Sequence, residues 1–203
     1  MWWTELDRIA GDLRALDGTD IAPSAIIHPE ALLEGPVRIG ERTRVCRGAH
    51  IIGPVEIGED CLIGDQVMLR GATRIGDHVR LGFCAEVKAS ILADHVSIGP
   101  QCFVADSLLD RDVYLGAQVR TSNHRLDKAN IQVQANGGTH DSGRDKLGTH
   151  IGARTTLGIQ CIILPGRIVP ADSLFGPRIT IEKNLPPGRY RLAQQLIAEG
   201  AGI

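Results

Sequence analysis

The sequence predicts an all-β fold, a parallel β-helix built from six-residue repeats. An aliphatic residue recurs at every sixth position from Ile21 to Val87 without a slip. A small or compact residue follows at the fourth position after each aliphatic, as at Ala25 and Ala31, and Gly often follows it directly, as at Gly40. An α-helix needs apolar spacings of three and four, and a long strand needs alternation, so short strands separated by corners fit this period best.

The repeat also sets the size of the prism. If three repeats form one coil, the aliphatic residues fill a triangular interior, and coils stack by parallel pairing at about 4.8 Å. The period shortens to five residues before Leu92 and again before Leu109, stops after Thr121, and resumes from Ile151 to Ile181. This pattern predicts roughly eight coils and a prism about 35 Å long.

The N-terminal segment, residues 1–20, has a different period. Leu6, Ile9 and Leu13 stand at helical spacing within residues 2–16. An amphipathic helix can cover the open end of a stack of coils, because a terminal coil has no neighbour to bury its apolar face. We therefore predict an N-terminal helix that caps the first coil.

The β-helix itself is predicted to occupy residues 21–183, with one interruption. Residues 123–146 break the repeat and are polar and rich in Gly, which indicates an excursion loop. Residues 184–203 form a C-terminal tail. Within the tail, residues 189–199 follow a Pro-Pro-Gly turn signal and predict a short C-terminal helix.

Composition excludes some classes of function. The 22 basic and 24 acidic residues leave a formal charge of −2, so no chain-wide attraction to nucleic acid or an anionic membrane is expected. Acidic residues interrupt the N-terminal apolar pattern, and no later stretch could span a bilayer, which predicts a cytoplasmic protein. The odd number and spacing of the cysteines predict reduced thiols rather than a disulfide framework, at Cys46, Cys61, Cys84, Cys102 and Cys161.

Several motifs carry a family resemblance. They are Gly82-Phe83-Cys84-Ala85-Glu86-Val87-Lys88, Val104-Ala105-Asp106-Ser107, Leu115-Gly116-Ala117, Ser122-Asn123-His124-Arg125-Leu126-Asp127, Lys146-Leu147-Gly148 and Leu164-Pro165-Gly166. Residues 70–181 resemble the acetyltransferase domain of the bifunctional sugar-1-phosphate nucleotidylyltransferases, including the N-acetylglucosamine-1-phosphate uridyltransferases and their archaeal relatives. No nucleotidylyltransferase domain precedes these motifs, so we do not expect that activity.

The resemblance implies both architecture and chemistry. It implies a left-handed hexapeptide β-helix, assembled as a homotrimer with active sites between neighbouring prisms. It also implies that acetyl-CoA is the co-substrate and that the acetyl group passes to the amine of an amino-sugar phosphate. Handedness comes from the resemblance alone, because the six-residue spacing does not determine it.

Three residues match substrate-binding positions of the family. Arg70 and Lys88 fall on positions that hold the sugar phosphate, and Asn123 falls on a substrate-contacting Asn. The spacing supports the pair, because Arg70 and Lys88 are 18 residues apart and each directly follows an inward aliphatic. Two stacked cations repel unless an anion lies between them, which favours a phosphate site. The alternative is two solvated surface charges.

The catalytic position of the family is altered. Where the family has its general-base His, this chain has Pro100, and the nearby Tyr and Asn of the family are Phe103 and Tyr114. Attack of an amine on a thioester needs a group that takes up a proton, and Pro cannot do so. His124, at the start of the excursion loop, is the predicted catalytic substitute; the alternative is a solvent-exposed loop histidine.

The expected CoA groove lies along the late coils. Family backbone-contact positions fall on Ala117, Gly158, Ile159 and Pro177. Arg178 is a candidate partner for the CoA phosphates, and weaker candidates of the same kind are Lys183, Arg189 and Arg191.

No metal centre is predicted. Asp60, His78, His95 and Asp112 should form a row on adjacent coils, which could bind a metal but is better explained as a hydrogen-bonded corner stack. The His spacing also does not match a γ-type carbonic anhydrase, which uses the same prism with three zinc-binding His.

Two functions of different classes follow. The first is an acyl-CoA-dependent acetyltransferase that acts on an amino-sugar phosphate or nucleotide sugar. The second is a catalytically silent trimeric protein that binds a sugar phosphate and serves as a scaffold or as a regulatory partner of a separate nucleotidylyltransferase. Loss of the family His favours the second, and retention of the substrate-contacting positions favours a ligand site in either case.

Overall fold

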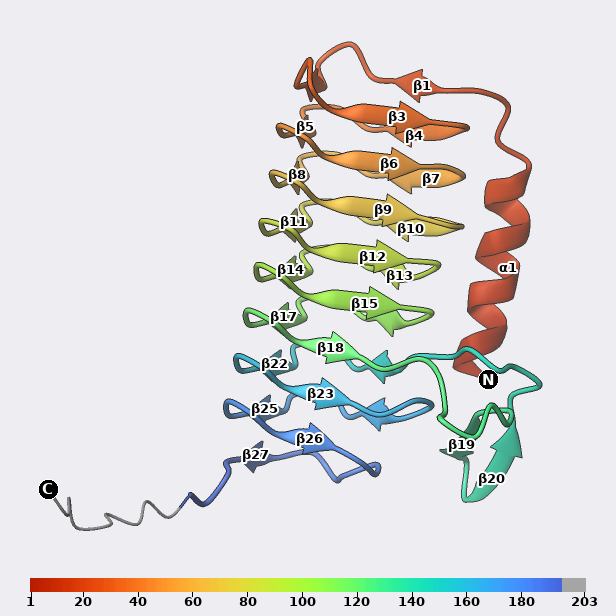
Figure 1. Ribbon diagram of the computed structural model, residues 1–203, viewed down its shortest axis with the longest axis vertical. Coiled ribbons are helices and arrows are strands. Elements are labelled where there is room, and N and C mark those ends of the chain that lie inside the picture. Colours follow the sequence, from red (N-terminus) through yellow and green to blue (C-terminus); the bar gives the residue numbers. More distant parts are fainter. Residues whose placement is uncertain (195–203) are drawn as a thin grey trace, which may run out of the picture.

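The computed structural model describes residues 1–194 as one helix followed by a triangular prism of parallel strands (Figure 1). Successive strands belong in rotation to three sheets, A, B and C, of eight, nine and eight strands. The fold is the predicted parallel β-helix, and it is consistent with left-handed winding. The strand counts agree with the predicted number of coils.

The three sheets have the following strands. Sheet A contains β1 (Asp20–Ile21), β4 (Val37–Ile39), β7 (Val55–Ile57), β10 (Thr73–Ile75), β13 (Ile91–Leu92), β16 (Leu108–Leu109), β21 (His150–Ile151) and β24 (Ile168–Val169). Sheet B contains β2 (Ile26–Ile27), β5 (Arg44–Val45), β8 (Leu62–Ile63), β11 (Arg80–Leu81), β14 (Ser97–Ile98), β17 (Tyr114–Leu115), β22 (Thr156–Leu157), β25 (Leu174–Phe175) and β27 (Arg189–Tyr190). Sheet C contains β3 (Leu32–Glu34), β6 (His50–Ile52), β9 (Met68–Arg70), β12 (Glu86–Lys88), β15 (Phe103–Ala105), β18 (Arg120–Thr121), β23 (Ile162–Ile163) and β26 (Thr180–Ile181).

The repeating aliphatic residues fill the interior of the prism. Ile51, Leu69 and Val87, which stack on successive coils of sheet C, are all fully buried. The first coil is the exception, because Ile21 is 38% exposed and has no coil above it. Burying such side chains supplies most of the stabilisation, at about 1.5–3 kcal/mol for each one fully removed from water.

The glycines that follow the aliphatic residues allow the coils to approach each other. A Cβ on Gly82, Gly99 or Gly116 would lie 2.7–2.8 Å from a backbone nitrogen of the next coil. Any larger residue would push adjacent coils apart at the corner between sheets B and C. The Gly pattern seen in the sequence therefore has a packing cause.

Helix α1 (Trp2–Arg14) forms where the apolar spacing predicted a helix, but it does not cap the first coil. It runs along the side of the prism against sheet A, where it contacts β10 and β16 (Figure 1). Its N-terminal turns bury Trp3 and Leu6 against Ile131 and Val133 of the excursion loop. The apolar spacing of a helix predicts which of its faces is buried. It does not predict which surface of the protein that face packs against. Within the described residues, no helix is long and apolar enough to cross a bilayer.

The predicted C-terminal helix is wrong in the part that the structure describes. Arg189 and Tyr190 form strand β27, which pairs with β25 and continues sheet B by one strand. The Tyr190 ring stacks on Phe175 with ring centroids 4.8 Å apart, so the tail covers the last apolar coil. The rest of the predicted helix, residues 195–199, lies outside the described residues.

Candidate functional site

Sheets C and A meet along an edge of the prism that we call the C–A edge. Arg70 and Lys88 end two neighbouring strands of sheet C and are paired in register, so they lie one above the other as the spacing predicted. Asp106 and Asn123 directly follow the next positions along the same edge. The sequence-predicted substrate residues therefore lie close together.

Carboxylates neutralise both stacked cations. Arg70 donates from Nε to Glu86 at 2.7 Å, and Lys88 Nζ lies 2.9 Å from Asp106 Oδ2. Asn123 Nδ2 donates to the same Asp106 oxygen at 2.6 Å, and Asp106 is only 7% exposed. The two cations consequently do not need an anion between them. We call Lys88, Asp106 and Asn123 the edge cluster.

The shortened repeat explains why Asp106 lies within reach of Lys88. The corner after β15 has one residue fewer than a six-residue repeat, and Asp106 turns it with a φ of 49°, a region that Asp tolerates better than most residues. Ser107 then points inward, donates to the Ala105 carbonyl at 2.7 Å and accepts from the Thr149 amide at 3.1 Å. These buried hydrogen bonds fix the corner.

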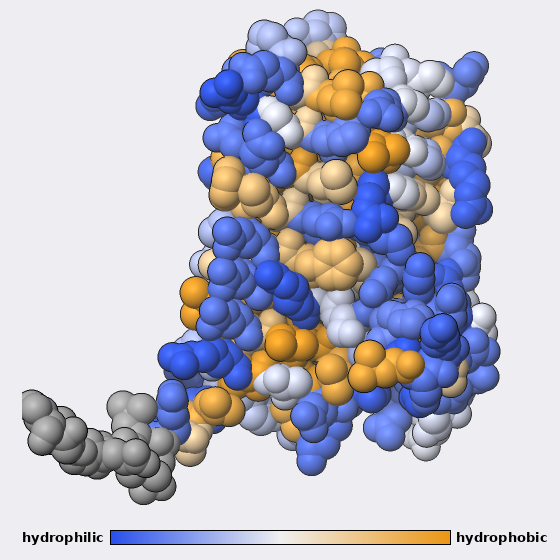
Figure 2. Space-filling view, in the orientation of Figure 1, coloured by the Kyte–Doolittle hydropathy of each residue, from blue (hydrophilic) through white to orange (hydrophobic). Residues whose placement is uncertain are grey.

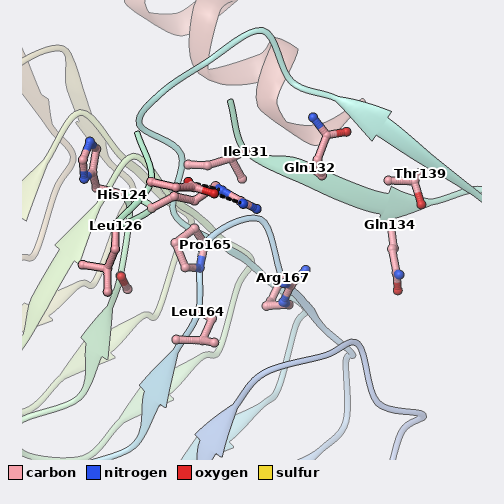
Figure 3. A pocket seen from close by; sticks show the side chains of 12 residues that line it. His124, Leu126, Ile131, Gln132, Gln134, Thr139, Leu164, Pro165 and Arg167 are labelled. Atoms are coloured by element: carbon pink, nitrogen blue, oxygen red, sulfur yellow. Dashed lines mark hydrogen bonds and ion pairs between the residues drawn. The ribbon is translucent and has the colours of Figure 1, made fainter. Parts of the chain in front are cut away.

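The excursion loop leaves the prism directly below the edge cluster. It contains a hairpin of β19 (Gln132–Ala135) and β20 (Gly138–Asp141), and an isolated bridge between His124 and Lys146 closes it at the prism. Gly166 allows the close approach of the loop, because it has a φ of 74° and a Cβ there would lie 2.7 Å from an Ile131 methyl carbon. The loop and the coil corner enclose a cavity of about 690 Å³, which we call the loop pocket (Figure 3).

Two cationic side chains of the loop pocket differ in their surroundings. Arg125 donates to both carboxylate oxygens of Asp127, at 2.8 and 2.5 Å, and this contact holds the pKa of Asp127 well below its usual range. Arg167 has no carboxylate partner within residues 1–194, and its Nε is buried without a hydrogen-bond acceptor. Burial, followed by the charge of Arg125, lowers the pKa of the Arg167 guanidinium.

His124, the predicted catalytic residue, lies at the rim of the loop pocket and is exposed. It follows Asn123, so it lies next to the edge cluster and on the C–A edge. Figure 3 shows His124 toward one end of the pocket, Arg167 near the middle, and Gln134 and Thr139 toward the other end. An imidazole and a guanidinium therefore both line this pocket.

The predicted CoA positions lie on a different edge. Ala117, Ile159 and Pro177 occupy equivalent corners of successive coils where sheets B and C meet, and Pro100 occupies the corner before them. Gly158 lies directly against the backbone of Pro177 on the next coil. Below them, Pro177, Arg178 and Arg191 line a small cavity of about 230 Å³.

Sheet C therefore separates the two predicted halves of the site within one chain. The edge cluster and His124 lie at one side of this sheet, and Pro100 with the CoA positions lies at the other. Figure 2 shows the outer face of sheet C, where apolar surface gathers over β18, β23 and the start of the loop. Ile162 and Leu126 are exposed there, at 40% and 102%. His124 and Pro100 therefore lie on different edges of the prism. Within one chain, His124 does not lie at the position where the family has its general-base His.

The two histidines of the Asp-His-His-Asp row stack, but in the described chain no side-chain hydrogen bond joins them to Asp60 or Asp112, so the predicted hydrogen-bonded row is not formed. The rings of His78 and His95 are parallel with centroids 4.9 Å apart, and Asp60 pairs with Arg42 at 2.6 Å. Across the part of the chain that the structure describes, no group of three or more His, Cys, Asp or Glu side chains is arranged to hold a metal ion. The cysteines are all free, and burial raises the pKa of Cys61 to about 11.

Sequence reasoning missed Arg167 and the partner role of Asp106. Both residues adjoin motifs that the sequence displays, Leu164-Pro165-Gly166 and Val104-Ala105-Asp106-Ser107. The signal available for Arg167 was a cation directly after a Pro-Gly corner and opposite the loop. Its lack of a carboxylate partner is a property of the folded chain and has no signature in the sequence.

Comparison with known proteins places the chain in a family. The family model "Bacterial transferase hexapeptide (six repeats)" matches residues 54–89. The chain is 49% identical over 180 residues to a protein of Escherichia coli strain 536 described as "uncharacterized acetyltransferase YaiX", and the match covers 89% of this chain and 77% of that protein. The chain belongs to the hexapeptide-repeat transferases and has acetyltransferase relatives.

A more distant curated relative agrees with this placement. A bifunctional sugar-1-phosphate nucleotidylyltransferase/acetyltransferase of Sulfurisphaera tokodaii is 32% identical over 164 residues, which cover 81% of this chain and 41% of that protein. Among solved structures, the UDP-N-acetylglucosamine O-acyltransferase of Moraxella catarrhalis is 16% identical over 83% of this chain and 66% of its own, with a TM-score of 0.41. At this identity and TM-score the structural likeness carries no argument about the site.

Proposed function

We propose that the chain is an acyl-CoA-dependent acetyltransferase that acetylates the amine of an amino-sugar phosphate or nucleotide sugar, as a cytoplasmic homotrimer. The observation that carries the proposal is the edge cluster beside the loop pocket, in a chain 49% identical to a protein described as an acetyltransferase. The cluster offers an ammonium, a carboxylate and an amide at one place. These groups match the hydroxyl and amine groups of a sugar.

In the proposed reaction, the substrate amine attacks the thioester carbonyl carbon and the carbon–sulfur bond breaks. His124 takes up the proton that the amine loses, and the departing thiolate of CoA is protonated as it leaves. Backbone N–H groups at the coil corners are suited to stabilise the oxyanion. Because His124 and the CoA positions lie on different edges of one prism, the edges of two neighbouring chains would form each active site.

A thiol-release assay tests this function. Wild-type protein is mixed with acetyl-CoA and either glucosamine-1-phosphate or galactosamine-1-phosphate, beside His124→Gln and the matched control His78→Gln. His78 is also exposed, but it lies in the corner stack on another edge. We expect His124→Gln to lower kcat by about a hundredfold, the usual size of a general-base contribution, and His78→Gln to match wild type. Equal rates for both variants would exclude His124 as the base.

The second function, a silent sugar-phosphate-binding scaffold or regulatory partner of a separate nucleotidylyltransferase, is favoured by one observation. Pro100 lies beside the predicted CoA positions, and the part of this edge nearest to it offers Phe83, Cys84 and Gln101 rather than a histidine. If the protein is a scaffold, calorimetry should detect binding of glucosamine-1-phosphate. The thiol-release assay should then detect no release from acetyl-CoA with either sugar phosphate. Release of thiol that depends on the sugar would exclude a scaffold.

A further inference from the structure

The loop pocket contains the cation best placed to bind a phosphate. Some arginines within residues 1–194 have no carboxylate partner, among them Arg44, Arg80, Arg111 and Arg120, but these are exposed to water. Arg167 also lacks a carboxylate partner within residues 1–194, but it differs from these arginines. It is partly buried, and its Nε is shielded from water without an acceptor. The guanidinium has thus lost hydration at Nε without gaining a partner there, and an anion bound to the group would offset this cost.

The other groups in the pocket are suited to the same ligand. Ser122, Gln132, Gln134 and Thr139 supply hydroxyl and amide donors around the cavity. The only carboxylate in its lining belongs to Asp127, which is already paired with Arg125. The pocket thus offers neutral polar side chains beside the apolar side chains of Ile131, Leu164 and Pro165, and it has no free negative charge of its own.

Arg70 and Lys88 contrast with Arg167 on the same edge. Each has a carboxylate at hydrogen-bonding distance, and Lys88 shares Asp106 with Asn123. A phosphate that approached them would meet Glu86 and Asp106 as well as the two cations. The favourable and unfavourable charges would largely cancel there.

We propose that Arg167 in the loop pocket binds the phosphate group of the acceptor, and that the edge cluster contacts its sugar hydroxyl and amine groups. This assignment rests on the proposed function for the identity of the acceptor. A phosphate in the pocket places the sugar toward His124 and Asn123, because both lie where the loop leaves the prism. The phosphates of CoA have the same chemistry, but the predicted CoA positions lie across sheet C.

Calorimetric binding tests the assignment without depending on turnover. Glucosamine-1-phosphate, glucosamine and CoA are each titrated into wild type, Arg167→Gln, Arg70→Gln and Arg80→Gln, where Arg80 is an exposed arginine without a carboxylate partner within the described chain. We expect Arg167→Gln to weaken glucosamine-1-phosphate at least tenfold and to leave CoA unchanged. Arg70→Gln and Arg80→Gln should stay within about threefold of wild type, because neither removes the unpaired and partly buried guanidinium of Arg167. Glucosamine should bind weakly to all four proteins.

Several outcomes would overturn the assignment. They are equal binding by Arg167→Gln and wild type, an equal loss in Arg70→Gln, and a loss of CoA binding rather than sugar-phosphate binding in Arg167→Gln. If Arg167→Gln fails to fold, phenylglyoxal modification of wild type followed by mass spectrometry serves instead. Glucosamine-1-phosphate should slow modification of Arg167 and not of Arg80, and equal rates at Arg167 with and without the sugar phosphate would refute the proposal.

The two proposals can fail separately. Sugar-phosphate binding that depends on Arg167, in a protein that releases no thiol, would keep the phosphate site and reject the acetyltransferase. Thiol release with an unchanged KM for glucosamine-1-phosphate in Arg167→Gln would keep the acetyltransferase and reject the phosphate site. KM is informative here because removal of a ground-state phosphate contact raises it with less effect on kcat.

Discussion

The ion-paired cations of the regular coils and Arg167 in the loop pocket differ in their charge partners. On the coils, several cations pair with a carboxylate one coil away, as Arg42 does with Asp60 and Arg154 does with Asp172, each pair 18 residues apart. Coil arginines without such a partner in the described chain, for example Arg80, are exposed to water. In the loop pocket, Arg167 has no carboxylate partner within the described residues. The coil repeat brings residues 18 apart together, so a sequence can place opposite charges one coil apart. The residue 18 positions before Arg167 is Thr149, which donates to the Arg167 carbonyl and offers no carboxylate to its guanidinium.

The comparison leads to different expectations for the two kinds of cation. Removing a paired cation leaves a carboxylate without its partner and should reduce stability. Removing the unpaired cation of a binding pocket should reduce ligand affinity and leave stability almost unchanged. The variants below test these expectations.

Lys88→Met should have the largest effect on stability. The side chains of Lys88 and Asp106 are only 20% and 10% exposed, so the variant leaves a nearly buried carboxylate with Asn123 as its remaining side-chain partner. We expect a loss of about 3 kcal/mol in the free energy of unfolding, measured by urea denaturation. Adding Asp106→Asn, which tolerates the same positive φ, should recover most of the loss. A double variant no more stable than Lys88→Met would reject a direct pairing.

Leu6→Ala should have a smaller effect that is confined largely to the loop. Leu6 packs against Ile131, Val133 and Leu147, so helix α1 supports the loop from outside the prism. We expect a loss of about 2 kcal/mol and faster amide hydrogen exchange in the loop, with exchange in the coils little changed. Leu13→Ala is the control, because Leu13 is also buried but does not belong to this cluster. Equal acceleration of loop exchange in both variants would contradict this role of α1.

Arg42→Gln should have a still smaller effect that depends on pH. The hydrogen bond from Arg42 lowers the pKa of Asp60 below its usual value in the folded chain. A lowered pKa stabilises the fold above the unfolded carboxyl pKa of about 3.9, and this stabilisation is lost as the pH falls through the folded value. The stability difference between wild type and Arg42→Gln should therefore be present at pH 7 and shrink below about pH 4, as urea midpoints would show. Arg80→Gln should show no such dependence, and an unchanged difference at low pH would contradict the ion pair.

The sequence predicted the prism well because every coil repeats the same local requirements. The inward aliphatic at Leu69, the Gly at the coil corner and the shortened corner before Leu109 each act through neighbours one coil away. The register that stacks Arg70 on Lys88 followed from the same period. The position of α1 against sheet A did not, because an amphipathic pattern does not identify its partner surface. Strand β27 was missed because its pairing with β25 depends on the turn that precedes it.

The candidate site was predicted in part for the same reason. The motif match selected Arg70, Lys88 and Asn123, and the position at the start of the loop selected His124. The structure places all four on the C–A edge, and His124 at the loop pocket. The motif match could not show that Glu86 and Asp106 neutralise the cations chosen for phosphate binding. That charge balance depends on side-chain contacts between coils, and it changes which cation is free to bind an anion.

Arg167→Gln should have the smallest effect on stability, and this makes it the sharpest test of the comparison. Its guanidinium is partly buried and unpaired, so removing the charge also removes an unfavourable desolvation and the repulsion from Arg125. We expect the free energy of unfolding without ligand to change by less than about 0.5 kcal/mol, or to rise slightly. With excess glucosamine-1-phosphate, wild type should gain stability by mass action and the variant should not. A large loss of stability without ligand would mean that Arg167 has a structural partner. The contrast between the ion-paired cations of the coils and an unpaired Arg167 would then fail.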